Sequence, residues 1–225
     1  MSAIPPRDLP VRLAVFDCDG TLVDGQGDIC AAMLSAFALH GLPAPDLHQV
    51  RRSVGLSLPR AIATLLPGHD AAAIADLVDS YKSAFRAARA EGRLSEPLYP
   101  GIPEALAQLA ANGWDLAVAT GKSRRGLDHC LANHNLTHRF RSLHTADEHP
   151  SKPDPAMLHA ALAAALAPPH AAVMIGDTAY DIAMAKAAGV TAIGVAWGYH
   201  TPAELRAAGA HAVAQSPQDL VALLA

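Results

Sequence analysis

The stretch VRLAVFDCDGTLVDG, Val11–Gly25, decides the fold, because an apolar run ends there in two aspartates one residue apart. The run 11–17 is typical of a buried strand. If the chain stays extended, Asp17 and Asp19 share one face of it, and two like charges that close repel each other. We therefore expect a cation or a reaction to use this pair of carboxylates.

Other short apolar runs predict further strands, and helical patterns separate them. The strands are expected at 11–17, 114–120, 171–177 and 191–197, with a weaker one at 210–215. Helices are expected at about 123–134, 154–166 and 180–188, the last ended by Gly189, and after Ser216 and Pro217 as N-cap and N1. Strands that alternate with helices predict an α/β fold, a Rossmann-like doubly wound parallel sheet covered on both faces.

Residues 24–97 interrupt this alternation. They contain no convincing strand, and their patterns predict helices around 28–39, 58–66 and 70–90, punctuated by proline and glycine. An all-helical insertion after the first strand is the simplest explanation. We therefore expect a core domain of residues 1–23 and 98–225 and a helical cap domain of residues 24–97.

Composition limits the possible partners and compartments. The chain has 225 residues, a formal net charge of -4 and no basic, aromatic-rich run, so nucleic acid is not expected as a partner. Three scattered cysteines suit a reducing cytoplasm better than a disulfide framework. The start, MSAIPPRDLP, lacks the apolar segment of a signal peptide, and no apolar run approaches the roughly 18 residues that span a bilayer. We expect a cytoplasmic protein with no membrane partner.

Three of the predicted strands end in polar clusters, namely FDCDGT, VATGKS and MIGDTAYD. Ligands of open parallel sheets bind at the carboxyl ends of the strands. One such cluster would be weak evidence, because these are ordinary turn residues, but three with complementary chemistry are more specific. The carboxylates of Asp17, Asp19, Asp177 and Asp181 provide the hard oxygen ligands that Mg²⁺ prefers beside a phosphate.

The same clusters contain groups that suit a phosphate. Thr120 and Gly121 follow a strand and offer a hydroxyl and an N–H to phosphate oxygens. Lys152, in SKPDP, can supply a point charge, and Gly20 allows the backbone to turn or to approach a ligand closely. A site for a metal ion and a phosphate is therefore predicted at this edge of the sheet.

The set DCDGT, ATGK, SKPDP and GDTAYD, in this order and spacing, resembles the haloacid-dehalogenase superfamily of phosphohydrolases. Within it, the chain is most similar to phosphoglycolate-phosphatase-like members with a helical C1-type cap, over essentially its whole length. The resemblance implies that Asp17 is the nucleophile and forms an aspartyl-phosphate. It implies that Asp19 is first the general acid for the leaving group and then the base for water.

The resemblance also implies the ligands of the cofactor, Mg²⁺. These are the Asp17 carboxylate, the Asp19 backbone carbonyl and Asp177, with Gly20 and Asp181 in support. The remaining groups, Thr120, Gly121 and Lys152, would bind the transferring phosphoryl group. The cap would exclude water and select the substrate.

The expected function is that of a Mg²⁺-dependent phosphatase, a monomer or homodimer, that hydrolyses a small phosphorylated metabolite, phosphoglycolate-like or a sugar phosphate. A phosphosugar mutase or a pyrophosphatase on the same core is an alternative, although Val54 and Leu58 stand where the mutase branch carries basic residues. A third possibility is a non-catalytic protein that binds a phosphorylated ligand. Asp19 disfavours it, because binding alone needs no acid or base. The sequence does not identify the phosphate ester, because cap side chains select it.

Overall fold

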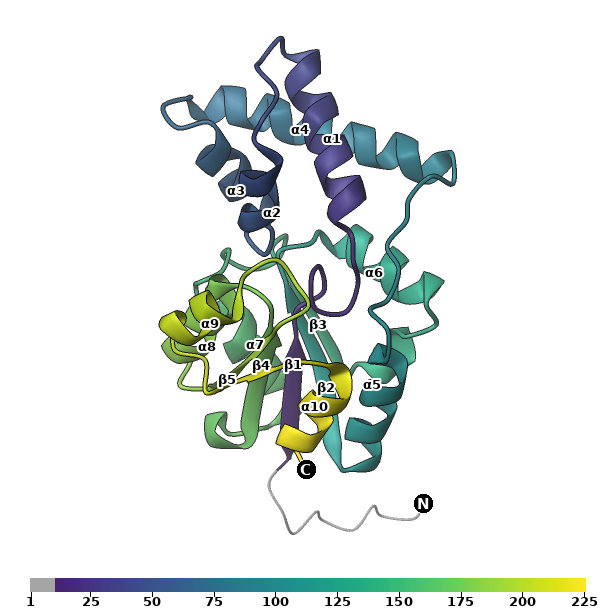
Figure 1. Cartoon of the computed structure of the whole chain (residues 1–225), viewed down its shortest axis with the longest axis vertical. Coiled ribbons are helices and arrows are strands. Elements are labelled where there is room, and N and C mark those ends of the chain that lie inside the picture. Colours follow the sequence, from purple (N-terminus) through teal and green to yellow (C-terminus); the bar gives the residue numbers. More distant parts are fainter. Residues whose placement is uncertain (1–10) are drawn as a thin grey trace.

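The computed structural model describes residues 11–225, and its centre is a six-stranded parallel sheet in the order β3-β2-β1-β4-β5-β6 (Figure 1). The strands are β1 (Arg12–Phe16), β2 (Trp114–Thr120), β3 (Ser142–Thr145), β4 (Ala172–Gly176), β5 (Thr191–Val195) and β6 (Ala212–Ala214). This order confirms the predicted doubly wound α/β fold. Residues 1–10 lie outside the described residues. The start of the expected core domain and the segment on which the signal-peptide expectation rests fall within them.

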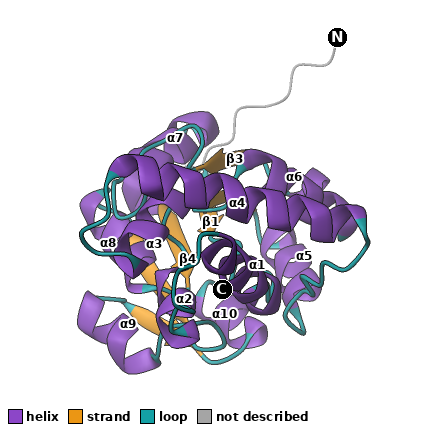
Figure 2. Ribbon diagram, turned by 90° about the horizontal axis from the view of Figure 1, so that it is seen from above, coloured by secondary structure: helices purple, strands orange, loops and turns teal. Residues whose placement is uncertain are grey.

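Helices cover both faces of the sheet and its upper end (Figure 2). They are α1 (Gln26–Leu39), α2 (Leu47–Ser53), α3 (Leu58–Leu65), α4 (Ala71–Ala90), α5 (Ile102–Ala111), α6 (Arg124–Asn133), α7 (Ala156–Ala165), α8 (Ala179–Ala187), α9 (Pro202–Ala208) and α10 (Pro217–Leu223), with short 3-10 turns at Thr137–Arg139 and Pro169–Ala171. Among the described helices, none is both long and apolar enough to cross a membrane.

The central strand β1 is buried on both faces, which is why its sequence is continuously apolar. Ala14 and Phe16 belong to the apolar cluster under α5, α6 and α10. Leu13 and Val15 belong to the cluster under α7, α8 and α9. Because β1 is fixed from both sides, the residues that follow Phe16 leave the sheet at a well-defined place.

Helices α1–α4, called here the four-helix segment, lie above the carboxyl end of the sheet (Figure 1). They have an apolar cluster of their own, which includes Met33, Phe37, Val50, Ile62 and Leu77. This separate apolar cluster supports our proposal that residues 24–97 form a cap domain distinct from the core domain. The helix α2 was not expected, because its sequence LHQVRRS is mostly polar and only Val50 and Ser53 are buried.

Three elements of the core are absent from the predicted set. The strand β3 has four residues at the edge of the sheet and is only partly buried, so it shows no long apolar run. The helix α9 has seven residues, and only Leu205 is buried. The helix α5 follows Gly101 with Pro103 in its first turn, and its buried residues Ile102, Ala105, Leu106 and Leu109 have the spacing of a helix. In each case the burial that stabilises the element comes from neighbours distant in sequence.

One prediction concerns the end of α7, where Leu166 adopts a left-handed conformation with φ 55° and is 83% exposed. A Cβ in that region costs roughly 1–2 kcal/mol, and the greater unfolded-state entropy of glycine offsets part of this. We expect Leu166→Gly to raise the free energy of unfolding in urea by up to about 1 kcal/mol. The control Ala163→Gly, at an exposed position within α7, should lower it by about 1 kcal/mol. A loss of stability in both variants would contradict the prediction.

Candidate active site

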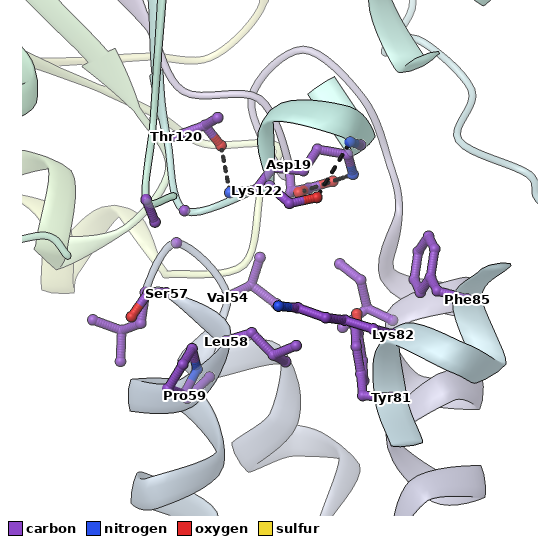
Figure 3. Close-up of a pocket in the computed structure, with 18 of the residues that line it drawn as sticks. Asp19, Val54, Ser57, Leu58, Pro59, Tyr81, Lys82, Phe85, Thr120 and Lys122 are labelled. Carbon is purple, nitrogen blue, oxygen red and sulfur yellow. Dashed lines mark hydrogen bonds and ion pairs between the residues drawn. The ribbon is translucent and has the colours of Figure 1, made fainter. Parts of the chain in front are cut away.

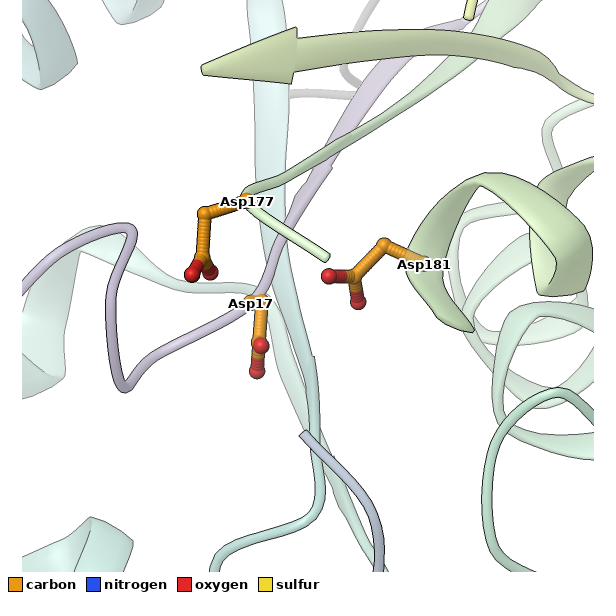
Figure 4. Close-up of side chains that lie close together, drawn as sticks. All are labelled: Asp17, Asp177 and Asp181. Atoms are coloured by element: carbon orange, nitrogen blue, oxygen red, sulfur yellow. The ribbon is translucent and has the colours of Figure 1, made fainter. Parts of the chain in front are cut away.

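The register of the sheet brings the three predicted polar clusters together. Phe16 pairs with Val118 of β2 and with Ile175 of β4. The next residues of these strands therefore meet at one edge, and the Asp17 N–H donates to the Ile175 carbonyl at 2.9 Å. The carboxylates of Asp17, Asp177 and Asp181 each place an oxygen within 4.8 Å of the others (Figure 4).

The Asp177 carboxylate is held from two sides. The Thr21 hydroxyl donates to its Oδ1 at 2.9 Å, and the Tyr199 N–H donates to its Oδ2 at 2.9 Å. Gly20 lies directly against it with φ 88°, and a Cβ there would come within 2.6 Å of the Asp177 Cγ, so only glycine fits. Burial raises the pKa of Asp177, the charges of Asp17 and Asp181 raise it further, and these hydrogen bonds offset only part of the shift.

Lys152 is fully buried between two carboxylates. Its Nζ lies 2.9 Å from Asp17 Oδ1 and 2.6 Å from Asp181 Oδ1. Burial lowers the pKa of Lys152, but the two carboxylates more than offset this effect, so its pKa lies above the ordinary value. Burial also dominates at Asp17, raising its pKa to about 7 despite the nearby ammonium.

Asp181 serves the helix and the site at once. It is the third residue of α8, and its Oδ2 accepts from the Thr178 N–H at 3.0 Å and the Thr178 hydroxyl at 2.7 Å in a capping box. Its Oδ1 accepts from Lys152. Helix capping and the proposed supporting role of Asp181 are therefore compatible, because different oxygens of its carboxylate serve them.

These residues fit a divalent cation. Carboxylate oxygens are the hard ligands that Mg²⁺ prefers. Asp17 Oδ2 is buried and has no hydrogen-bond partner among the described groups. The three carboxylates and Lys152, counted in their ionised forms, leave a formal charge of -2, which one divalent ion neutralises.

Asp19 is not part of this acidic cluster. Its carboxylate accepts from Lys122 Nζ at 2.8 and 3.1 Å, and Lys122 also donates to Glu96 Oε1 at 2.6 Å (Figure 3 draws the contact of Lys122 with Asp19). Asp17 and Asp19 were expected to share a face if the chain stayed extended, but β1 ends at Phe16 and their side chains take different partners.

Lys122 and Glu96 are the site residues that sequence reasoning missed. Lys122 stands inside the quoted VATGKS cluster, so its position was visible but its partners were not. Glu96 gives no local signal, because it lies outside any helix or strand on the return from the four-helix segment. Only the tertiary structure shows that a single ammonium bridges the two carboxylates.

Thr120 and Gly121 lie where the four-helix segment meets the sheet. The Thr120 hydroxyl accepts from the Lys122 N–H at 3.3 Å. A Cβ at Gly121 would lie 2.6 Å from the Gly55 carbonyl, so glycine allows the loop between α2 and α3 to approach this closely. The Ser57 N–H of that loop donates to the Ser151 hydroxyl, next to Lys152, at 2.8 Å.

A cavity of about 450 Å³ lies between the four-helix segment and the strand ends (Figure 3). Asp19, Thr120 and Gly121 line its core side, and the loop from Ser53 to Leu58 and helix α4 line its other walls. The site therefore combines a buried, acidic cluster with an adjoining space large enough for an organic ligand.

Comparison with known proteins identifies the family. The family described as haloacid dehalogenase-like hydrolase matches residues 14–195, so the chain belongs to that family. A probable phosphatase, IndB, of Dickeya dadantii is 36% identical over 93% of this chain and 91% of its own length. A phosphoglycolate phosphatase of Pseudomonas savastanoi pv. phaseolicola is 34% identical over 84% of this chain and 71% of its own.

A solved structure supports the same assignment. A haloacid dehalogenase-like family hydrolase from Streptococcus pneumoniae has a TM-score of 0.83 at 26% identity, covering 96% of this chain and 99% of that one. The predicted family, fold class and enzyme class, a hydrolase related to phosphatases, are therefore confirmed.

Another prediction follows from the Lys122 bridge. Lys122→Met leaves the Asp19 and Glu96 side chains, 10% and 6% exposed, without their cation. Removing one partner of a buried ion pair costs roughly 3–5 kcal/mol. We expect a decrease of that order in the unfolding free energy in urea, and partial recovery in Lys122→Met/Glu96→Gln, because one stranded charge is removed.

The control for this prediction is Lys186→Met, which removes an exposed lysine of α8 and should change stability by less than about 0.5 kcal/mol. The same small effect for Lys122→Met, or no recovery in the double variant, would refute the prediction.

Proposed function

We propose that the chain is a Mg²⁺-dependent phosphatase that hydrolyses a small phosphomonoester through an aspartyl-phosphate intermediate. The observation that carries the proposal is the buried group of Asp17, Asp177 and Asp181 around Lys152, at the same sheet edge as Thr120 and Gly121. The names of the related phosphatases support it. Residues 24–97 act as the cap that closes this site.

In the first step Asp17 attacks the phosphorus atom. Its Oδ1 accepts from Lys152 and from the Cys18 N–H, and these contacts fix the orientation of the attacking carboxylate. The oxygen–phosphorus bond to Asp17 forms as the ester oxygen leaves. Asp19 enters this step as the carboxylic acid and gives this oxygen its proton, which avoids an alkoxide product.

In the second step water cleaves the aspartyl-phosphate. Asp19, deprotonated after the first step, takes a proton from the attacking water, and the Asp17 carboxylate leaves as phosphate is formed. The Thr120 hydroxyl, the Gly121 N–H and the Lys152 ammonium stabilise the phosphoryl oxygens throughout. Positioning and charge therefore account for most of the catalysis.

The cofactor would be held by the carboxylates of Asp17 and Asp177 and by the Asp19 backbone carbonyl, with Gly20 and Asp181 in support. When bound, Mg²⁺ supplies the positive charge that lets a phosphate dianion approach three carboxylates. We place the enzyme in the cytoplasm, as a monomer or homodimer, and its three buried, free cysteines suit that reducing compartment.

Replacement of the nucleophile tests the mechanism. Asp17→Asn keeps the size of the side chain but removes the nucleophilic carboxylate, so we expect kcat to fall by at least about 10³-fold. Phosphate release from a panel of phosphomonoesters, phosphoglycolate included, measures this, and circular dichroism checks that the variant is folded. A wild type without turnover on the whole panel, or a fully active Asp17→Asn, would show that the proposal is wrong.

Metal removal tests the cofactor. Dialysis against EDTA should abolish phosphate release, and Mg²⁺ should restore it. Asp177→Asn weakens the ligand set, so it should raise the Mg²⁺ concentration that gives half-maximal activity by about tenfold or more. The control Asp128→Asn removes an exposed carboxylate of α6 and should leave that concentration unchanged. Full activity after chelation would rule out the metal.

A further inference from the structure

The cavity beside the proposed catalytic centre is larger than a phosphoryl group requires. Its volume of about 450 Å³ lies in the range of roughly 300–1,000 Å³ found for pockets that bind drug-sized ligands. A two-carbon acid such as phosphoglycolate would occupy only a small part of it. The size of the cavity therefore indicates an ester with a larger organic body.

Four cationic side chains line this cavity without an ionic partner among the described residues. Lys82, Arg86 and Arg89 come from α4, and Arg125 comes from α6. The Arg86 guanidinium donates to the Ser83 hydroxyl, and the Arg89 Nε is buried with no partner in the described part of the chain. These cations are separate from Lys122, which is engaged by Asp19 and Glu96.

The positive charge of the lining is local, because the chain as a whole carries a formal net charge of -4. Apart from Asp19, the acidic residue in the lining is Asp147, whose Oδ2 accepts from the Arg124 N–H. A concave site lined by one sign of charge concentrates ligands of the opposite sign. The lining therefore favours an anion in addition to the phosphate that the strand ends would bind.

Apolar groups line the same cavity as the cations. Tyr81 and Phe85 of α4 stack with their ring centroids 5.5 Å apart, and both line the cavity. The Lys82 side chain extends from α4 across the space towards Val54 (Figure 3). A ligand in this cavity therefore meets both apolar and cationic surface.

We propose that the substrate is a phosphate monoester with an apolar or aromatic body and a second anionic group remote from the ester. Lys82 and Arg125, one from each side of the cavity, bind that second anion, while Tyr81 and Phe85 contact the body. The inference rests on the proposed phosphatase function and adds the class of substrate. Carboxylate and phosphate are both anions that such cations bind.

Three matched esters test the inference, namely phenyl phosphate, 4-carboxyphenyl phosphate and 1,4-phenylene bisphosphate. They share the aromatic body and differ in the group at its far end. Because the second anion would form charge-assisted hydrogen bonds, we expect kcat/KM to be about 10- to 100-fold higher for at least one of the two esters that carry it than for phenyl phosphate. The two anionic esters show whether the site prefers a carboxylate or a phosphate.

Variants connect that preference to the named residues. Lys82→Gln and Arg125→Gln should each lower the ratio of kcat/KM for the preferred anionic ester to that for phenyl phosphate, and the double variant should bring it to within about threefold of one. The ratio is insensitive to partial loss of folded enzyme. The control Lys186→Gln removes an exposed lysine outside the cavity and should keep the wild-type ratio.

The outcomes separate the inference from the function on which it rests. A wild type that hydrolyses phenyl phosphate without preferring either anionic ester overturns the second-anion site and leaves the phosphatase proposal standing. A preference that both variants retain also overturns the second-anion site. A higher kcat/KM for phosphoglycolate than for all three aromatic esters overturns the apolar or aromatic body instead, because phosphoglycolate carries a second anion without that body. A wild type that hydrolyses no phosphomonoester overturns both proposals.

Discussion

The buried ammonium of Lys152 is the interaction on which the site depends. A charged group removed from water is stable only if opposite charges and hydrogen bonds replace its hydration. Lys152 finds these in Asp17 and Asp181, which come from the end of β1 and the first turn of α8. Three segments distant in the sequence are thereby fixed against one another, and the carboxylates are held at a spacing suited to a divalent ion.

The sheet explains why this arrangement lies where it does. In the order β3-β2-β1-β4-β5-β6 the parallel strands β2 and β3 lie on one side of β1, and β4, β5 and β6 lie on the other. The order of the strands therefore reverses between β1 and β4, which is the position where open parallel sheets bind ligands. Asp17 and Asp177 follow these two strands directly. The apolar packing on both faces of β1 provides the rigidity, and the polar chemistry is confined to the positions where the strands end.

The bridge from Asp19 through Lys122 to Glu96 gives the return linker of the four-helix segment a direct connection to the proposed acid and base. Chemistry and selectivity are thus divided in space. The strand ends provide the carboxylates and the proposed phosphate-binding groups, whereas α4 provides most of the cationic and aromatic lining of the cavity.

The sequence by itself determined the α/β class, because continuous apolar runs such as those of β1 and β4 are required of strands buried on both faces. It also determined which polar residues follow the strands and where some helices begin, as at Ser216, whose hydroxyl caps α10. Local chemistry is sufficient for these features. Only the tertiary structure decided the edge strand β3, the separate partners of Asp17 and Asp19, and the bridge formed by Lys122. Each of these depends on contacts between distant segments, and the energy of such contacts leaves no periodic pattern in the sequence.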